Sequence, residues 1–294
     1  MPSLGRVLTA MATPMHDDRR VDYDGVQTLA AYLVDHGSDG LVVCGTTGES
    51  PTLSHDETLK MFRVTVEAVG DRATVVAGTG KNDTAATVAL TREATALGVD
   101  AIMLVTPYYN RPSQRGLANH FTQAAAATDL PVMLYNIPSR SAAEIAPETV
   151  LELATSVDNI VAVKDAVGDF VKTAWLAGRK PTDFDIYSGD DATFLPLLAV
   201  GGTGVVSVAA HLVGDDIARM VELYPTDPVH AREIHLRLLP VFTGLFVDTS
   251  PGPLKAALHM AGLPAGPVRP PLADADERVE QALRDAFDQA GVTL

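Results

Sequence analysis

The segment Ile160-Val161-Ala162-Val163-Lys164-Asp165 is the stretch that best indicates both fold and chemistry. Its apolar, mostly β-branched residues predict a buried strand, and that strand ends on a lysine. An unpaired ammonium is costly to bury, so this lysine must pair, lose its charge or react. Side chains alternate along a strand, so Asp165 should point to the opposite side and pair poorly with Lys164.

Similar short apolar runs recur along the chain, and longer segments with apolar residues at helical spacing separate them. Good N-cap residues open three of these segments, predicted as helices over Asp22–His36, Ser54–Val69 and Asp83–Leu97. The predicted strands are Val7–Pro14, Gly40–Gly45, Thr74–Gly80, Ala101–Pro107, Pro131–Asn136, Ile160–Asp165, Asp185–Asp190 and Gly204–Val208. This alternation predicts an α/β fold with a parallel sheet, and the number of units favours closure into a (β/α)8 TIM barrel.

After Val208 the pattern changes to helices with no clear strand between them. We therefore expect a catalytic barrel over residues 1–214 and a C-terminal helical extension over residues 215–294, with a last helix near Ala273 to Ala290. A doubly wound open sheet uses the same alternation but needs a phosphate-binding glycine loop after an early strand. Val75 stands where the first glycine of such a loop belongs, which favours the barrel.

Composition limits the classes of partner and the compartment. The formal net charge of −15 opposes binding to nucleic acid or to an anionic membrane, because both require a basic surface. The single cysteine, Cys44, excludes an internal disulfide and fits a reducing compartment. No stretch reaches the ~18 apolar residues of a membrane span. We expect a cytoplasmic protein with neither nucleic-acid nor membrane partners.

In a TIM barrel the loops that follow the strands build the active site. Lys164 ends one strand, Tyr135 ends the strand before it, and Tyr109 and Thr46 follow two others. A neutral lysine amine is the nucleophile that attacks a ketone, and grouped hydroxyls can relay the protons that imine formation requires. The pattern alone leaves open a structural lysine paired at a strand end, and tyrosines that only pack in the core.

Other polar residues after the strands suit a small anionic substrate. Thr47 and Arg140 can bind a carboxylate, although an exposed arginine is more often merely solvated. For Glu49, Asp190 and Asp191 we favour capping of the next helix over acid–base or metal roles. No histidine falls at a strand end near a second ligand, so we expect neither a metal nor a cofactor.

Six segments carry a resemblance to the dihydrodipicolinate synthase family of pyruvate-dependent aldolases. They lie in the same order across nearly the whole barrel, which makes chance similarity implausible. The segments are GTTGES (45–50), TPYYNRPSQ (106–114), YNIPSR (135–140), VKDA (163–166), YSGDD (187–191) and GVVSV (204–208).

The resemblance implies a reaction and its catalytic residues. The family condenses pyruvate with L-aspartate 4-semialdehyde to 4-hydroxy-tetrahydrodipicolinate in lysine and diaminopimelate biosynthesis, without a cofactor. Lys164 would form the imine with pyruvate, and Tyr135 would give and accept protons beside it. Thr46 and Tyr109 would complete the relay, with Tyr109 reaching into the neighbouring subunit of a homotetramer built as a dimer of dimers.

The resemblance also implies the substrate contacts. Thr47 and the backbone at Val206 would hold pyruvate. Gly189 and Arg140 would line the site, and Arg140 would bind the carboxylate of aspartate semialdehyde. The chain departs from the family's Glu-x-Asn-Pro-x-Pro-Val-Lys pattern, because it has Asp248-Thr249-Ser250-Pro251-Gly252-Pro253-Leu254-Lys255 there.

Two rival functions remain. Another pyruvate-type lyase, acting on N-acetylneuraminate or a keto-sugar acid, would share Lys164, Tyr135 and the GTTGE loop, whereas Arg140 better suits a short carboxylated aldehyde. A catalytically silent, metabolite-binding paralogue would tolerate loss of these residues, yet all are present.

The resemblance bears on feedback by lysine as well. Relatives that are inhibited by lysine resemble one another in carrying a histidine and a glutamate where this chain has Thr58 and Ala86. We therefore expect weak or absent inhibition.

Overall fold

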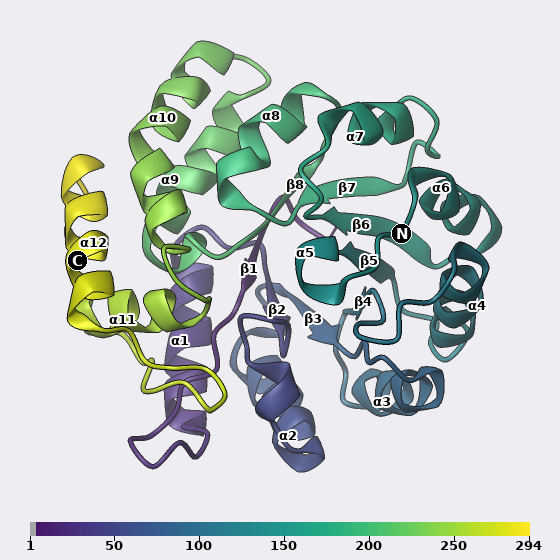
Figure 1. Cartoon of the computed structure of the whole chain (residues 1–294), viewed down its shortest axis with the longest axis horizontal. Coiled ribbons are helices and arrows are strands. Elements are labelled where there is room, and N and C mark those ends of the chain that lie inside the picture. The colour runs from purple at the N-terminus through teal and green to yellow at the C-terminus, as the bar shows by residue number, and fades with distance from the viewer. Residues whose placement is uncertain (1–3) are drawn as a thin grey trace.

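The computed structural model describes residues 4–294 and contains a closed barrel of eight parallel strands in sequential order (Figure 1). The strands are β1 (Val7–Ala10), β2 (Gly40–Val43), β3 (Thr74–Gly78), β4 (Ala101–Val105), β5 (Val132–Asn136), β6 (Ile160–Asp165), β7 (Asp185–Ser188) and β8 (Gly204–Ser207). Pairing of Leu8 with Val206 joins β1 to β8 and closes the barrel. The TIM barrel is confirmed, and the doubly wound open sheet is excluded.

Each predicted strand has its counterpart, but several end earlier than the sequence indicates. The first ends at Ala10 rather than Pro14, and the second ends at Val43 rather than Gly45. The apolar run continues past the ladder in these places because the loops over the barrel mouth are themselves buried, as Met11 and Cys44 are. The hydrophobic pattern therefore indicates which residues are buried, but it does not indicate where strand pairing ends.

Helices follow the strands and form the outer ring of the barrel (Figure 1). They are α1 (Tyr23–Asp35), α2 (His55–Val69), α3 (Thr84–Ala96), α4 (Gln114–Ala125), α5 (Pro138–Ser141), α6 (Pro147–Ser156), α7 (Phe170–Ala177), α8 (Phe194–Ala199) and α9 (Ala210–Leu223), with short 3₁₀ turns η1 (Ser50–Thr52) and η2 (Asp191–Thr193). The expected N-caps are confirmed, because Asp22, Ser54 and Asp83 each accept a backbone N–H from the first turn of their helices.

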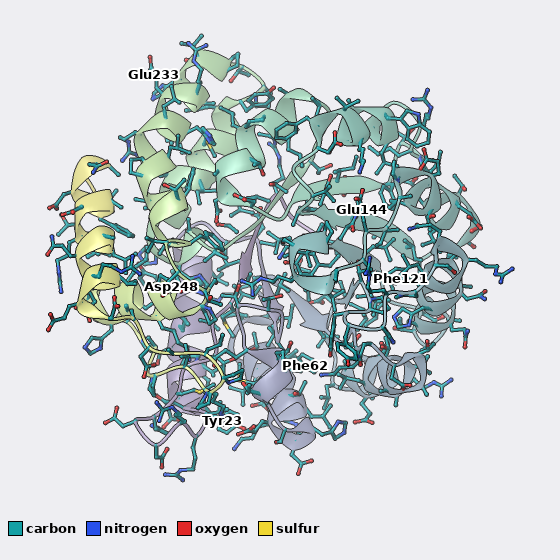
Figure 2. All side chains as sticks on the ribbon, viewed as in Figure 1. Tyr23, Phe62, Phe121, Glu144, Glu233 and Asp248 are labelled. Carbon is teal, nitrogen blue, oxygen red and sulfur yellow. The ribbon has the colours of Figure 1, made fainter. Side chains whose placement is uncertain are left out.

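The core has two layers that follow the alternation along the strands. One set of strand residues packs outward against the helices, together with the buried Phe62 of α2 and Phe121 of α4 (Figure 2). The other set fills the barrel interior, where Tyr135, Tyr187 and Val206 belong to one apolar cluster. The interior is therefore packed, and polar chemistry is confined to its ends.

The C-terminal region continues as helices α10 (Pro228–Gly244), α11 (Gly252–Met260) and α12 (Glu277–Gln289), so the expected extension and its last helix are present. Helix α9 runs across residue 214, where the sequence places the division between barrel and extension. That division stays a prediction. The long loop between α11 and α12 passes towards α1 and α2 (Figure 1). No helix within residues 4–294 is both long and apolar enough to cross a membrane.

Candidate active site

Lys164 and Tyr135 form the centre of the candidate site. They are direct partners in the register of β5 and β6, so their side chains project to the same side of the sheet. The Lys164 Nζ lies 4.0 Å from the centre of the Tyr135 ring. Both residues are buried, with 5% and 3% of their surfaces exposed. The structure thus places a lysine amine against a phenol at the carboxyl end of the strands.

Lys164 has no carboxylate within ion-pairing distance among residues 4–294. Its neighbour Asp165 faces the other way, as strand alternation predicts, and accepts hydrogen bonds from the Val167 N–H at 2.9 Å and the Thr173 hydroxyl at 2.8 Å. Burial raises the pKa of the Asp165 carboxyl. The interpretation of Lys164 as one half of a structural ion pair with Asp165 is therefore wrong.

Gly189 leaves room for the lysine arm. A Cβ built on Gly189 would lie 3.1 Å from the Lys164 Cε and 2.7 Å from the Ala166 Cβ. Side-chain atoms do not approach a real Cβ at the second distance, so any larger residue would displace this part of the site. The structure accordingly brings Gly189 next to Lys164, although the contact is steric and not polar.

Thr46 and Tyr135 share a small cavity at the mouth of the barrel. Its lining comes from the ends of β2, β3, β4 and β5, and consists of Cys44, Gly45, Thr46, Ser50, Gly78, Gly80, Met103, Val105 and Tyr135. Thr47, the next residue in the same loop, is buried. Val206 lies in β8 within the apolar cluster that also contains Tyr135. Thr46 and Ser50 are therefore the hydroxyl side chains that line this cavity together with Tyr135, whereas Lys164 is not among its lining residues.

Arg140 and Tyr109 are the two expected site residues whose side chains are exposed. Arg140 lies on the short helix α5 after β5, and its guanidinium has no ion-pair partner among residues 4–294. Tyr109 is 89% exposed and has a φ of +74°, in the left-handed region that non-glycine residues seldom occupy. The loop beside it is fixed by a hydrogen bond from the Asn110 amide to the Asn82 carbonyl at 2.7 Å.

The capping hypothesis holds for one of three acidic residues. Asp190 caps η2 by accepting the Ala192 N–H at 2.8 Å. Asp191 instead turns away from the helix that follows it, because its buried carboxylate accepts the Ser207 hydroxyl and the backbone N–H groups of Val208 and Ala209. Asp191 thus fixes the start of the loop after β8, and burial raises the pKa of its carboxyl.

Glu49 is the other correction. It makes no capping hydrogen bond, and its carboxylate Oε1 lies 2.6 Å from the Lys255 Nζ of α11. Burial lowers the pKa of the Lys255 ammonium, and the neighbouring Glu49 opposes that shift. The sequence analysis did not identify this pair. Lys255 lies in a predicted helix, and nothing in the surrounding sequence indicates that its side chain is buried against the loop after β2.

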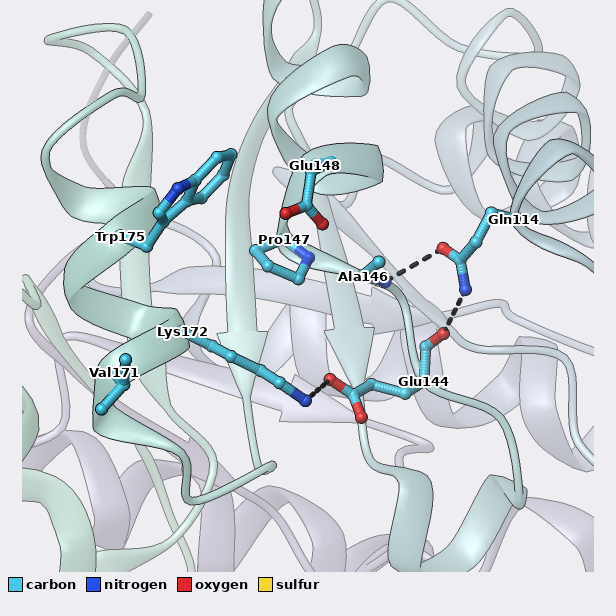
Figure 3. A pocket seen from close by; sticks show the side chains of 8 residues that line it. All are labelled: Gln114, Glu144, Ala146, Pro147, Glu148, Val171, Lys172 and Trp175. Atoms are coloured by element: carbon cyan, nitrogen blue, oxygen red, sulfur yellow. Dashed lines mark hydrogen bonds and ion pairs between the residues drawn. The ribbon is translucent and has the colours of Figure 1, made fainter.

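A second, more open hollow lies outside the barrel between α4, α6 and α7 (Figure 3). The Lys172 ammonium contacts the Glu144 carboxylate there at 2.6 Å, and Gln114 bridges the backbone of Glu144 and Ala146. None of the expected site residues lines it. Across residues 4–294, no three His, Cys, Asp or Glu side chains are grouped so that they could hold a metal ion.

Comparison with known proteins identifies the family. The model of the dihydrodipicolinate synthetase family matches residues 3–290. The 4-hydroxy-tetrahydrodipicolinate synthase of Moorella thermoacetica is 53% identical over 289 residues, covering 98% of this chain and 99% of the relative. The enzyme of the same name from Symbiobacterium thermophilum is 50% identical, covering 99% of this chain and all of the relative.

Solved structures give the same result for the fold. A dihydrodipicolinate synthase from Bacillus anthracis superposes with a TM-score of 0.95 at 43% identity, covering 98% of this chain and 99% of that one. A relative from Cyanidioschyzon merolae, solved with lysine bound, gives a TM-score of 0.96 at 45% identity and covers 98% of both chains. The chain therefore belongs to the dihydrodipicolinate synthetase family.

Proposed function

We propose that this chain condenses pyruvate with L-aspartate 4-semialdehyde, through an imine on Lys164, to give 4-hydroxy-tetrahydrodipicolinate in lysine and diaminopimelate biosynthesis. The observation that carries the proposal is the buried Lys164 amine, which lies against Tyr135 and has no carboxylate partner in the described chain. A lysine placed in this way has a phenol beside its amine and no carboxylate that ties it into an ion pair, which suits a nucleophile that attacks a ketone.

The chemistry begins on pyruvate. The Lys164 amine adds to the ketone carbon, and one water leaves as the imine forms. Loss of a methyl proton then gives an enamine. Tyr135 and Thr46, which share one cavity, supply and remove the protons in these steps. Thr47 and the backbone at Val206 hold the carboxylate of pyruvate, and Gly189 leaves space for the lysine arm.

The second substrate enters from the mouth of the barrel. The enamine carbon attacks the aldehyde carbon, and the aldehyde oxygen takes up a proton. The amino group of the semialdehyde then displaces Lys164 from the imine carbon and closes the ring, so that one water is lost overall. We assign the exposed Arg140 to the carboxylate of this substrate, because a guanidinium can make two parallel hydrogen bonds to a carboxylate.

Tyr109 completes the proton relay from a neighbouring subunit. Its ring is exposed and its backbone is held in an unfavourable conformation, a combination that suits a side chain whose contacts lie on another molecule. A homotetramer, built as a dimer of dimers, would supply that neighbour. The single cysteine and the biosynthetic role support a cytoplasmic location.

A direct assay tests the proposed function. The purified protein should be given pyruvate with aspartate semialdehyde and, in parallel, N-acetylneuraminate and keto-sugar acids. Turnover with aspartate semialdehyde at least a hundredfold above the others supports the proposal. A preference for a sugar acid would assign the chain to the rival lyase group, and inactivity towards all of them would favour the silent paralogue.

A further inference from the structure

A buried ion pair joins the loop after β2 to the C-terminal helices. Glu49 lies two residues after Thr47, and its carboxylate contacts the Lys255 Nζ of α11 at 2.6 Å. The two side chains are only 1% and 3% exposed. Lys255 lies outside the barrel, so the C-terminal region places a buried charge directly against the loop that carries Thr46 and Thr47.

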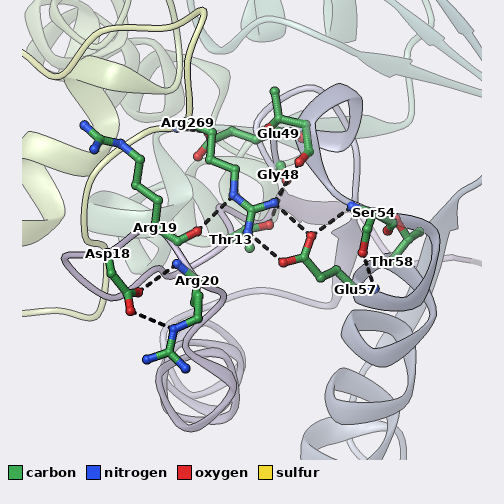
Figure 4. A network of polar contacts seen from close by, with 11 residues as sticks. Thr13, Asp18, Arg19, Arg20, Gly48, Glu49, Ser54, Glu57, Thr58 and Arg269 are labelled. Atoms are coloured by element: carbon green, nitrogen blue, oxygen red, sulfur yellow. Dashed lines mark hydrogen bonds and ion pairs between the residues drawn. The ribbon is translucent and has the colours of Figure 1, made fainter.

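The segment after α11 holds the same loop at further points. The Lys255 Nζ also donates to the Pro267 carbonyl at 2.9 Å, and the Arg269 N–H donates to the second oxygen of Glu49 at 2.8 Å. The Arg269 guanidinium binds both carboxylate oxygens of Glu57, at 2.8 and 2.6 Å, and donates to the Thr52 carbonyl at 2.7 Å. Figure 4 shows Arg269 reaching between Glu49 and Glu57. The loop is thus held from Glu49 to the first turn of α2.

The loop needs such support because its backbone is strained. Cys44 and Glu49, on either side of the two threonines, have φ angles of +55° and +57°. A non-glycine residue in this region is energetically disfavoured and persists only where its surroundings enforce it. Within the loop, the Glu49 N–H donates to the Thr46 carbonyl at 3.0 Å, so movement of Glu49 would carry Thr46 with it.

We infer that Glu49 and Lys255 are positioning residues, and that their ion pair holds Thr46 and Thr47 where they face Tyr135 and pyruvate. This inference rests on the proposed function. Neither residue lines the small cavity that contains Thr46 and Tyr135, so their effect passes through the loop backbone. A buried ion pair adds little net stability relative to apolar residues of similar size. The role that we assign to this pair is therefore to fix the conformation of the loop.

The test uses the full chain with both charges replaced, Glu49→Leu/Lys255→Met, because replacing one alone would strand a buried charge. We expect the double variant to fold with a moderately lower melting temperature, because the Arg269 N–H and the Pro267 carbonyl lose their side-chain partners. Its kcat should fall at least tenfold and its KM for pyruvate should rise, since Thr46 and Thr47 act on that substrate. Its KM for aspartate semialdehyde should stay within about twofold, because Arg140 lies on another loop.

Leu238→Ala in α10 is the matched control. Leu238 is fully buried and is not part of the catalytic loop, so its truncation should lower the melting temperature while kcat and both KM values stay unchanged below unfolding. A folded double variant with wild-type kcat and pyruvate KM would overturn the inference. A double variant that fails to fold would also overturn the inference, because the ion pair would then be needed for stability. If pyruvate and borohydride left no reduced imine adduct on Lys164 of the wild type, the proposed function would be rejected instead.

Discussion

The Lys164 Nζ lies 4.0 Å from the centre of the Tyr135 ring, and the two residues are partners across β5 and β6. Tyr187 of β7 pairs with Lys164 from the other side, so the lysine stands between two tyrosines in one row of the barrel. The Tyr187 hydroxyl donates to the Gly5 carbonyl at 2.7 Å, which directs it away from the relay. Of these two tyrosines, we therefore assign proton transfer at the Lys164 amine to Tyr135.

Borohydride reduction should trap this chemistry. Pyruvate added together with borohydride is expected to leave a pyruvate-sized adduct on Lys164, because reduction converts the imine to an amine that no longer hydrolyses. Mass spectrometry of the digested protein locates the adduct. The Lys164→Ala variant is the control and should take up none. An unmodified Lys164 peptide from an active preparation would reject the imine mechanism.

Arg140→Ala should separate the two substrates. The loss of one charge-assisted contact should cost ~1.5–3 kcal/mol, or roughly tenfold to a hundredfold in kcat/KM for aspartate semialdehyde. Imine formation with pyruvate, followed by trapping, should be nearly unchanged. Arg63→Ala, an exposed arginine on α2, controls for loss of surface charge. An equal loss in both steps would show that Arg140 does not bind the second substrate.

Tyr109 should act across a subunit interface. Tyr109→Phe and Lys164→Ala are each expected to be inactive, and mixing them under conditions of subunit exchange should restore part of the activity. A mixed pair then contains one site with both residues intact. Each variant mixed with itself provides the baseline. If exchanged mixtures stay inactive although mass measurements show mixed oligomers, Tyr109 works within its own chain or has no catalytic role.

The Glu57–Arg269 pair should make stability depend on pH. Hydrogen bonding from Arg269 lowers the pKa of the Glu57 carboxyl from 4.5 to about 2. A depressed pKa means that the folded state favours the charged form, so the stabilisation is complete above about pH 5 and is lost as the pH falls towards 2. Partial exposure of the pair weakens this effect, so Glu57→Gln should reduce the free energy of unfolding by about 2 kcal/mol at pH 7 and by clearly less at pH 3.

Denaturant unfolding of both proteins across this pH range provides the measurement. Glu280→Gln removes an exposed i,i+4 pair with Arg284 and is the control, with little effect expected at either pH. A Glu57→Gln difference that stays constant from pH 7 to pH 3 would show that the carboxylate charge contributes nothing.

The sequence predicts the barrel because strand and helix periodicities are local signals, and the run from Ile160 to Asp165 even has the correct ends. Lys164 is identifiable from the sequence because a lysine after four apolar residues of a strand is unusual. The prediction that Glu49 and Asp191 cap helices is wrong, because their partners Lys255 and Ser207 belong to distant segments that only the folded chain brings near. Several predicted strands extend too far at their carboxyl ends, because the buried loops that follow them are as apolar as the strands.

The last prediction concerns inhibition by lysine. A relative from Cyanidioschyzon merolae has been solved with lysine bound. In this chain Thr58 is buried, with its hydroxyl donating to the Ser54 carbonyl at 2.9 Å, and Ala86 is exposed on the first turn of α3. Asp83, three residues before Ala86, caps that helix by accepting the Ala86 N–H at 2.7 Å. The position of the glutamate in inhibited relatives thus offers the lysine ammonium no carboxylate.

Truncating one member of a buried charge pair typically costs about 2–5 kcal/mol, which corresponds to a loss of roughly thirtyfold or more in affinity. We therefore expect weak or absent inhibition at millimolar lysine, measured as a dose–response curve at subsaturating pyruvate. Ala86→Glu should restore the missing carboxylate and lower the half-inhibitory concentration at least tenfold, whereas Ala86→Gln, of similar shape but uncharged, should not. Half-inhibition of the wild type below about a millimolar would show that another acid, such as Asp83 or Glu93 beside His55, meets the ammonium.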